Sequence, residues 1–128
     1  MFIATSAGIT CLMRAAIGDI LAAGVAELAT GLFDECAAIA TAEGFPPRAE
    51  FLARTRPMFT APGSPLTASM LRDIERGAPI EADHILGDLL RYGGVSRDAG
   101  SLLNIAFRHV KAYEARRARN QAETHKAA

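Results

Sequence analysis

The stretch from Ser64 to Leu90 constrains the fold most, because its residues are typical of a helix, a break and a second helix. Pro65 suits the first turn of a helix, where its missing N–H costs no hydrogen bond, and Ser64 before it is a suitable N-cap. Gly77 is a typical helix end, and Pro79 cannot continue the helix. We therefore predict one helix that begins at Ser64 and ends at Gly77, followed by a second that reaches Leu90.

Apolar residues recur every four positions in both predicted helices, which is the spacing of one buried stripe. Gly87 lies inside the second helix, where it lowers helix stability, and we expect another backbone to pack close to it. The stripes consist of Leu66, Met70 and Ile74 on the first helix and of Ile85 and Leu89 on the second.

Three polar residues of this stretch are candidates for a binding site. Ser69 and Asp73 are four residues apart and therefore share one helix face, away from the apolar stripe. Glu81 follows the break, in the first turn of the second helix. These residues are either ordinary caps and helix-dipole partners or the polar floor of a pocket for a small polar substrate.

The same stretch resembles the signature of the ketopantoate reductase family, S-M-x-x-D-x-x-x-G-x-x-x-E-x-D-x-x-x-G. The matching positions are Ser69-Met70, Asp73, Gly77, Glu81, Asp83 and Gly87, with further similarity at Gly18-Asp19-Ile20, Asp34 to Ala38, Ala42-Glu43-Gly44 and Gly94-Val95. Residues from about 9 to 116 follow the order of the family's C-terminal domain. The resemblance therefore implies the fold of the C-terminal domain of 6-phosphogluconate-dehydrogenase-like reductases.

What the resemblance implies about function concerns a larger enzyme. In the family an N-terminal Rossmann domain binds NADPH, and the helical domain closes the substrate cleft and often forms the homodimer. The enzyme reduces a 2-keto acid to a 2-hydroxy acid, and a lysine protonates the developing alkoxide. By resemblance, Glu81 is the catalytic-site glutamate, which holds that lysine and the substrate. Ser69 hydrogen-bonds the substrate, and Asp73 is assigned to the substrate-binding site with a structural role at the helix break.

The chain also departs from the family pattern. The family lysine would fall just before Met1, and neither Lys111 nor Lys126 is near the motif in the sequence. Positions that hold substrate-binding asparagines in the family correspond here to Ile3, Ala7 and Ile17. An Ile- and Ala-lined pocket cannot form the same hydrogen bonds, so we expect a less polar keto substrate.

The chain shows no glycine-rich phosphate loop after a strand and therefore no dinucleotide-binding motif of its own. We expect it to be inactive alone, either as a fragment of a longer enzyme or as a product that has lost its Rossmann half. The alternative is a free-standing helical module that forms dimers without catalysis. A third option is a small regulator that uses its basic tail on nucleic acid.

The rest of the chain also predicts helices, because alanine is abundant and β-branched runs are absent. We predict an all-α, bundle-like domain of six or seven helices over 1–116 and a polar, frayed tail over 117–128. The first helix, to Met13, is apolar almost all round and must be surrounded by protein. Further helices are expected over about 25–43 and 47–55, and from a cap at Ser96 or Asp98.

Composition argues against several partners. Fourteen basic and fourteen acidic residues give a formal net charge of zero, which offers no support for nucleic acid or an anionic membrane. Arg116, Arg117 and Arg119 fit a solvated helix end better than an RNA or phosphate contact. No metal spacing occurs, so Cys11 and Cys36 are predicted to be buried free thiols in a reducing cytoplasm.

Overall fold

The computed structural model describes residues 1–92 and 100–127. These residues form seven α-helices, one short 3-10 helix and one π-helical segment, without a strand, which confirms the all-α prediction. No helix in this described part combines the length and apolar character needed to cross a membrane. In chain order the elements are α1 (Phe2–Met13), α2 (Ile17–Ala22), α3 (Ala26–Ala42), α4 (Ala49–Thr55), η1 (Arg56–Phe59), α5 (Ser69–Glu75), η2 (Asp83–Gly87), α6 (Asp88–Tyr92) and α7 (Leu102–Ala127).

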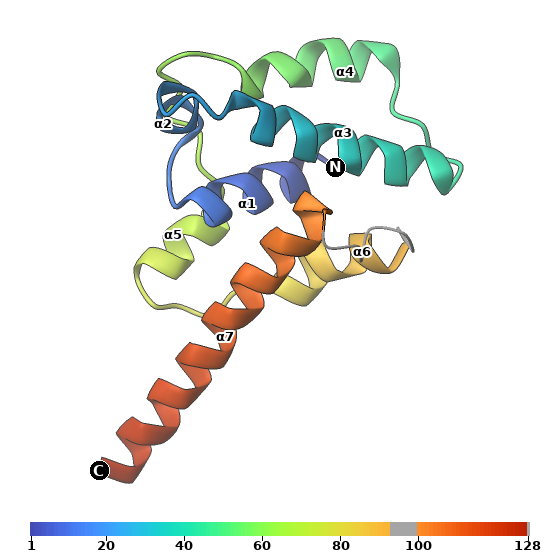
Figure 1. Cartoon of the computed structure of the whole chain (residues 1–128). Coiled ribbons are helices and arrows are strands. Elements are labelled where there is room, and N and C mark those ends of the chain that lie inside the picture. The colour runs from blue at the N-terminus through green and yellow to red at the C-terminus, as the bar shows by residue number, and fades with distance from the viewer. Residues whose placement is uncertain (93–99, 128) are drawn as a thin grey trace.

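Helix α1 lies at the centre of the domain and packs against α3, α5, α7 and η2 (Figure 1). All of its residues from Ala4 to Cys11 are buried, which confirms that the helix is surrounded by protein. Its hydroxyl groups are satisfied by the helix itself: Thr5 Oγ1 donates to Met1 O at 2.9 Å and Thr10 Oγ1 to Ser6 O at 2.6 Å. Apolar and hydroxyl side chains can therefore share one buried helix without unpaired polar groups.

Four helices end in a left-handed residue that reverses the chain. Gly24, Gly44 and Gly77 have φ values of 79°, 87° and 71° after α2, α3 and α5. After α5 the Gly77 N–H donates to the Ile74 carbonyl at 3.1 Å, as in a Schellman motif. After α1 the same position holds Arg14, at φ 55°, although glycine adopts this conformation at least cost.

The predicted start of α5 at Ser64 is wrong, since the helix begins at Ser69. The residues before it instead bind α2: the Ile17 N–H donates to Leu66 O at 3.0 Å and the Gly18 N–H to Ser64 O at 2.9 Å. A Cβ atom on Gly18 would lie 2.6 Å from the Ser64 nitrogen. Tertiary hydrogen bonds and this close backbone approach thus override a local helix signal at Pro65.

The second predicted helix also differs from expectation. Its first part, η2, is a π-helix, and α6 continues it from Asp88 to Tyr92. The neighbour of Gly87 is a side chain and not a backbone, because a Cβ there would meet the Phe107 ring at 3.0 Å. Phe107 comes from α7, so the missing side chain of Gly87 still permits close helix packing.

The short helix η1, after α4, contributes one of the largest core side chains. Phe59, at the end of η1, is fully buried, with its ring centroid 5.5 Å from that of Phe2 and 5.6 Å from that of Phe33. The guanidinium of Arg56 lies 5.0 Å from the centroid of the Phe33 ring. This aromatic group anchors η1 on α1 and α3.

Helix α7 begins at Leu102, with Ser101 as its N-cap: Ser101 Oγ accepts a hydrogen bond from the Asn104 N–H at 3.1 Å. The caps expected at 96 and 98 lie outside the described residues. Glu35 of α3 accepts a second bond, from the Leu103 N–H at 3.3 Å. The helix continues to Ala127 and projects from the domain body (Figure 1). The fraying of 117–128 stays a prediction.

Candidate functional site

Two of the three predicted site residues lie on α5, and the third lies shortly before η2. Ser69 is the first residue of α5, and Asp73 follows one helical turn later. Glu81 lies in the short connection between α5 and η2. Ser69 and Glu81 are exposed, and within the described part of the chain neither side chain has a hydrogen-bond or ion-pair partner. Both are therefore free to bind a ligand.

Helix α1 lies against both of these elements. The Thr10 hydroxyl of α1 accepts a hydrogen bond from the Ala68 N–H at 3.2 Å, which fixes the chain just before Ser69. On the other side, the carbonyl of Glu81 accepts a bond from the Ile85 N–H at 2.9 Å and starts the next helix. Ser69 and Glu81 thus stand at the starts of two elements that both pack on α1.

Asp73 is engaged at the end of α5. Its carboxylate accepts a hydrogen bond from Arg76 at 2.6 Å, and its backbone carbonyl accepts one from the Ala78 N–H at 2.8 Å. The carboxylate side chain is 30% exposed. Both bonds join Asp73 to residues of the turn that follows α5, so Asp73 stabilises the break between the two helices.

Sequence reasoning missed one cation near this region. Lys111 of α7 places its Nζ 3.0 Å from Asp83 Oδ2 and 2.8 Å from Glu114 Oε1. Lys111 donates hydrogen bonds to the Glu114 carboxylate and to that of Asp83, and these bonds, that to Glu114 first, raise the pKa of Lys111 above its usual value. Such a lysine holds its proton firmly and is a weak acid. No local signal pairs these residues, because 28 positions separate Lys111 from Asp83.

A hollow of about 490 Å³ lies beside the start of α1. Its lining is mostly apolar and includes Ile3, one of the positions where the family resemblance places an asparagine. Its polar part is a pair in which His84 Nδ1 lies 3.1 Å from Asp88 Oδ2, and Asp88 also pairs with Arg91. None of the three predicted site residues lines this hollow, whose walls are Met1, Ile3, Ala4, His84, Ile85, Asp88, Leu89 and Tyr92.

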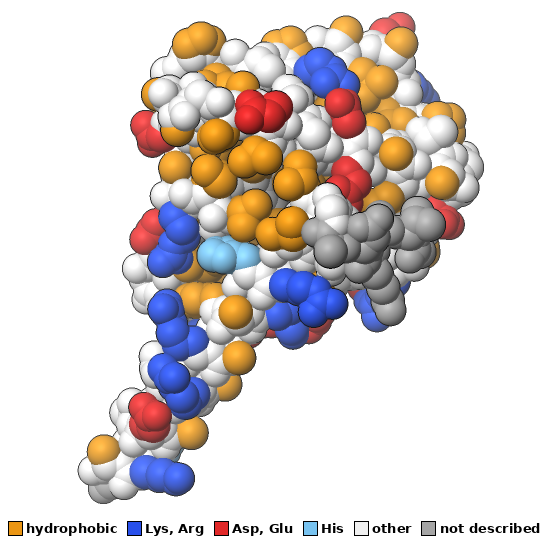
Figure 2. Space-filling view, viewed as in Figure 1, with side chains coloured by type: hydrophobic (Ala, Val, Ile, Leu, Met, Phe, Trp, Pro, Cys, Tyr) orange, Lys and Arg blue, Asp and Glu red, His pale blue; other side chains and the backbone are white. Residues whose placement is uncertain are grey.

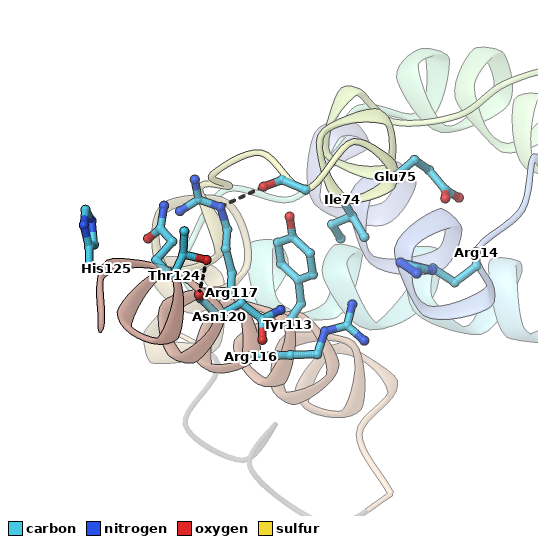
Figure 3. A pocket seen from close by; sticks show the side chains of 11 residues that line it. Arg14, Ile74, Glu75, Tyr113, Arg116, Arg117, Asn120, Thr124 and His125 are labelled. Carbon is cyan, nitrogen blue, oxygen red and sulfur yellow. Dashed lines mark hydrogen bonds between the residues drawn. The ribbon is translucent and has the colours of Figure 1, made fainter. Parts of the chain in front are cut away.

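A larger groove of about 610 Å³ lies between the end of α5 and the second half of α7 (Figure 3). Its lining is polar and rich in arginine, and it includes Arg14 from the end of α1. Sequence reasoning considered Arg116, Arg117 and Arg119 without Arg14 and interpreted them as a solvated helix end, so it did not find this cluster. The groove is separate from the three predicted site residues, none of which lines it.

The two cysteines carry no reactive chemistry here. Cys11 and Cys36 are both buried and free, as predicted. Burial raises the pKa of Cys11 to about 12 and that of Cys36 to about 11, so both are neutral thiols at physiological pH. In the described ranges no group of three His, Cys, Asp or Glu side chains is placed to hold a metal ion.

Comparison with known proteins gives one family. Residues 1–114 match the model for the C-terminal region of ketopantoate reductase PanE/ApbA. The chain is also 31% identical over 116 residues to the "Uncharacterized oxidoreductase YkpB" of Bacillus subtilis (strain 168). That match covers 90% of this chain but only 38% of the relative. No solved structure matches the chain. The chain therefore belongs to the family of ketopantoate reductase C-terminal domains.

Proposed function

We propose that this chain is the substrate-binding and dimerisation domain of an oxidoreductase that reduces a 2-keto acid with NADPH. Its family membership and its similarity to a protein named as an oxidoreductase support this proposal. The free thiols at Cys11 and Cys36 suit a cytoplasmic location.

The residues of this chain do not fit NADPH itself. A dinucleotide site needs a glycine-rich turn between a strand and a helix, and residues 1–92 and 100–127 contain no strand. NADPH would therefore be bound by a separate dinucleotide-binding domain. We expect the chain alone to reduce no keto acid.

The observation that carries the assignment of roles is the free state of Ser69 and Glu81 at the starts of two elements that flank α1. A serine hydroxyl can donate to and accept from a substrate, so Ser69 would bind its polar oxygens. The Glu81 carboxylate would hold a catalytic ammonium group and orient the substrate. Asp73 would act indirectly, because its contacts maintain the turn that separates these two residues.

The proposed substrate class rests on Ile3, at a position where the family resemblance places a substrate-binding asparagine, and not on Ser69 or Glu81, which do not line the hollow beside Ile3. Ile3 is 65% exposed and lines the hollow beside the first turn of α1, together with Ile85 and Leu89. Apolar walls favour a substrate whose side chain is a hydrocarbon over one that carries a hydroxyl. We therefore propose a 2-keto acid with an apolar side chain.

The test is a chimaera in which this chain replaces the matching region of the Bacillus subtilis relative. We expect NADPH oxidation that depends on a 2-keto acid, with 4-methyl-2-oxopentanoate preferred to ketopantoate. Glu81→Ala should lower kcat/KM by about 100-fold or more, and Ser69→Ala should mainly raise KM. Glu50→Ala, an exposed carboxylate of α4, is the matched control and should change neither.

The outcomes separate the parts of the proposal. If Glu81→Ala retained activity within about twofold, only a few tenths of a kcal/mol, the role of Glu81 would be wrong. If ketopantoate were the preferred substrate, the function would stand and the apolar substrate class would fall. A well-folded chimaera that binds NADPH but reduces no 2-keto acid would contradict the function itself.

A second candidate function is a dimerisation module without catalysis. Ile3, Phe45 and Tyr92 are 65%, 78% and 65% exposed, and such apolar side chains favour self-association. Sedimentation equilibrium should then give a dimer that Glu81→Ala and Ser69→Ala leave unchanged. A monomer at all accessible concentrations would exclude this candidate.

A further inference from the structure

The arginine-rich groove beside α7 is not used by the proposed reductase function. We propose that it binds a small anion with two or more negative charges, such as a phosphate ester, and that Arg14 and Arg116 are the ligands. The groove is lined by Arg14, Ile74, Glu75, Gly77, Tyr113, Arg116, Arg117, Asn120, Gln121, Thr124 and His125.

The groove concentrates positive charge on a chain whose formal net charge is zero. Three arginines line it against one carboxylate, that of Glu75, so the formal lining charge is three minus one, or +2, with histidine neutral. A second hollow of about 290 Å³ shares Arg14 and Arg116 and adds His109 but no acidic residue. Lys and Arg side chains also follow α7 along the visible surface in Figure 2. The local field therefore favours an anion.

Arg14 and Arg116 are two arginines that are not engaged elsewhere in the fold. In the described part of the chain neither side chain has a hydrogen-bond or ion-pair acceptor. Their guanidinium groups nevertheless point toward each other across the groove, one from the end of α1 and one from α7 (Figure 3). Two like charges repel each other. An anion between them would offset that repulsion and accept hydrogen bonds from both guanidinium groups.

What separates Arg14 and Arg116 from the other unpaired arginines of the described chain, Arg48, Arg54 and Arg72, is that both line this groove. Several exposed arginines pair with a carboxylate, as Arg56 does with Asp34 at 2.5 Å. Arg117 lines the groove but donates from Nε to the Gly77 carbonyl at 2.9 Å, which explains its position as a cap for the α5 turn. That explanation does not extend to Arg14 or Arg116, because neither donates to a helix-end carbonyl.

The backbone of Arg14 gives an independent argument. Arg14 is the one non-glycine residue with positive φ in the described ranges, although glycine serves at the three equivalent helix ends. A left-handed conformation is costly for a residue with a side chain, and such strain is concentrated at functional positions. The left-handed turn directs the Arg14 side chain into the groove (Figure 3).

The walls of the groove are held in place before any ligand binds. The Tyr113 hydroxyl donates to the Ala78 carbonyl at 2.7 Å, and Arg117 donates to Gly77 in the same loop. These two bonds fasten the middle of α7 to the turn after α5. A preformed site loses less entropy when it binds a ligand. The volume of about 610 Å³ suits a small molecule.

The experiment titrates the chain as it stands with inorganic pyrophosphate, at constant ionic strength, and follows backbone amide shifts by NMR. Shifts should concentrate at 14–16, 75–78 and 113–121. Arg14→Gln and Arg116→Gln should each weaken binding by about fivefold or more, since each removes a charged donor. Arg119→Gln is the matched control on the same helix, because Arg119 pairs with Glu123 at 3.8 Å and does not line the groove.

Each outcome decides the proposal. Saturable binding that both groove variants weaken and Arg119→Gln leaves intact supports it. Equal weakening by all three variants would show only a diffuse basic field and overturn it, as would no saturable shift. Binding to vesicles that contain phosphatidylinositol phosphate without pyrophosphate binding would mean a membrane surface and not a small anion. The test needs neither NADPH nor a keto acid, so its result is independent of the reductase proposal.

Discussion

The hydroxyl of Thr10 accepts a hydrogen bond from the backbone N–H of Ala68 at 3.2 Å, although 58 positions separate the two residues. Thr10 is fully buried in the last turn of α1, and its hydroxyl donates to the Ser6 carbonyl. The one hydroxyl thus forms a hydrogen bond within its own helix and a second one that holds Ala68, the N-cap residue of α5, in place. Because Ser69 follows Ala68, the position of a candidate substrate ligand depends on this buried threonine.

Thr10→Val keeps the shape of the side chain but removes the acceptor for the Ala68 N–H. A partly buried donor without a partner costs about 1 to 3 kcal/mol, so we expect the free energy of unfolding to fall by that amount. Urea denaturation measures the loss, and hydrogen exchange at Ala68 should accelerate more than exchange in α3. The control is Thr41→Val, which removes an exposed hydroxyl that donates only to Ala37 O. A change below about 0.5 kcal/mol for both variants would contradict the role of Thr10.

Gly18→Ala tests the close approach between α2 and the segment before α5. The added methyl would lie 2.6 Å from the Ser64 nitrogen and 2.7 Å from the Gly63 carbonyl carbon, and backbone atoms cannot yield as a flexible side chain does. We expect a loss of about 3 kcal/mol in the free energy of unfolding, from overpacking and from weakened bonds to Ser64. Gly31→Ala is the control, because its methyl would meet only the flexible Leu102 Cδ1, at 3.1 Å. Equal thermal melting temperatures for the two variants would show that the contact relaxes at little cost.

The elements that sequence predicts well are those set by the local residue pattern. The apolar first helix and the helix expected over about 25–43 correspond to α1 and α3, and Gly77 follows the end of α5 as expected. The resemblance to the reductase domain likewise rests on spaced residues, and the family match bears it out.

The features that sequence reasoning missed are set by contacts between distant segments. Ser64 and Pro65 suggest a helix start, but the carbonyl of Ser64 is used by Gly18 of α2. Glu35 supports the start of α7 from 68 positions away. The groove is a similar case, because Arg14 and Arg116 come from opposite ends of the sequence and meet only in the fold. No local pattern carries such information.

Alkaline pH should destabilise the protein through its two thiols. Burial raises the pKa of Cys11 to about 12 and of Cys36 to about 11, above the ordinary value of 9.0 that the unfolded chain restores. The unfolded state therefore loses these protons first. The stabilisation is complete below pH 9 and is lost as pH rises toward 11 and 12, at up to about 1.4 kcal/mol per pH unit for each thiol.

Urea denaturation at pH 8 and pH 10 measures this effect. We expect the wild-type chain to lose about 2 to 3 kcal/mol more than a Cys11→Ala, Cys36→Ala double variant over that interval. The lysines and tyrosines are the same in both proteins, so their titration cancels when the loss of stability in the double variant is subtracted from that in the wild type. An equal loss in both proteins would mean that the thiols titrate normally in the folded state.

Arg14→Gly separates the backbone of this position from its side chain. Glycine adopts the observed φ of 55° without the steric cost that a side chain carries, so the variant should gain about 1 kcal/mol in the free energy of unfolding. The same variant removes a groove guanidinium and should bind pyrophosphate at least about fivefold more weakly. Arg14→Ala is the matched control, because it removes the guanidinium but keeps a Cβ in the strained conformation. It should lose binding without the gain in stability.

Denaturation and NMR titration of the three proteins together measure both effects. If Arg14→Gly and Arg14→Ala were equally destabilised and bound pyrophosphate like the wild type, the arginine would serve the end of α1 and not a ligand. If Arg14→Gly raises the free energy of unfolding and weakens pyrophosphate binding, then Arg14 lowers the stability of the fold while it supplies a positive charge that the groove needs for binding.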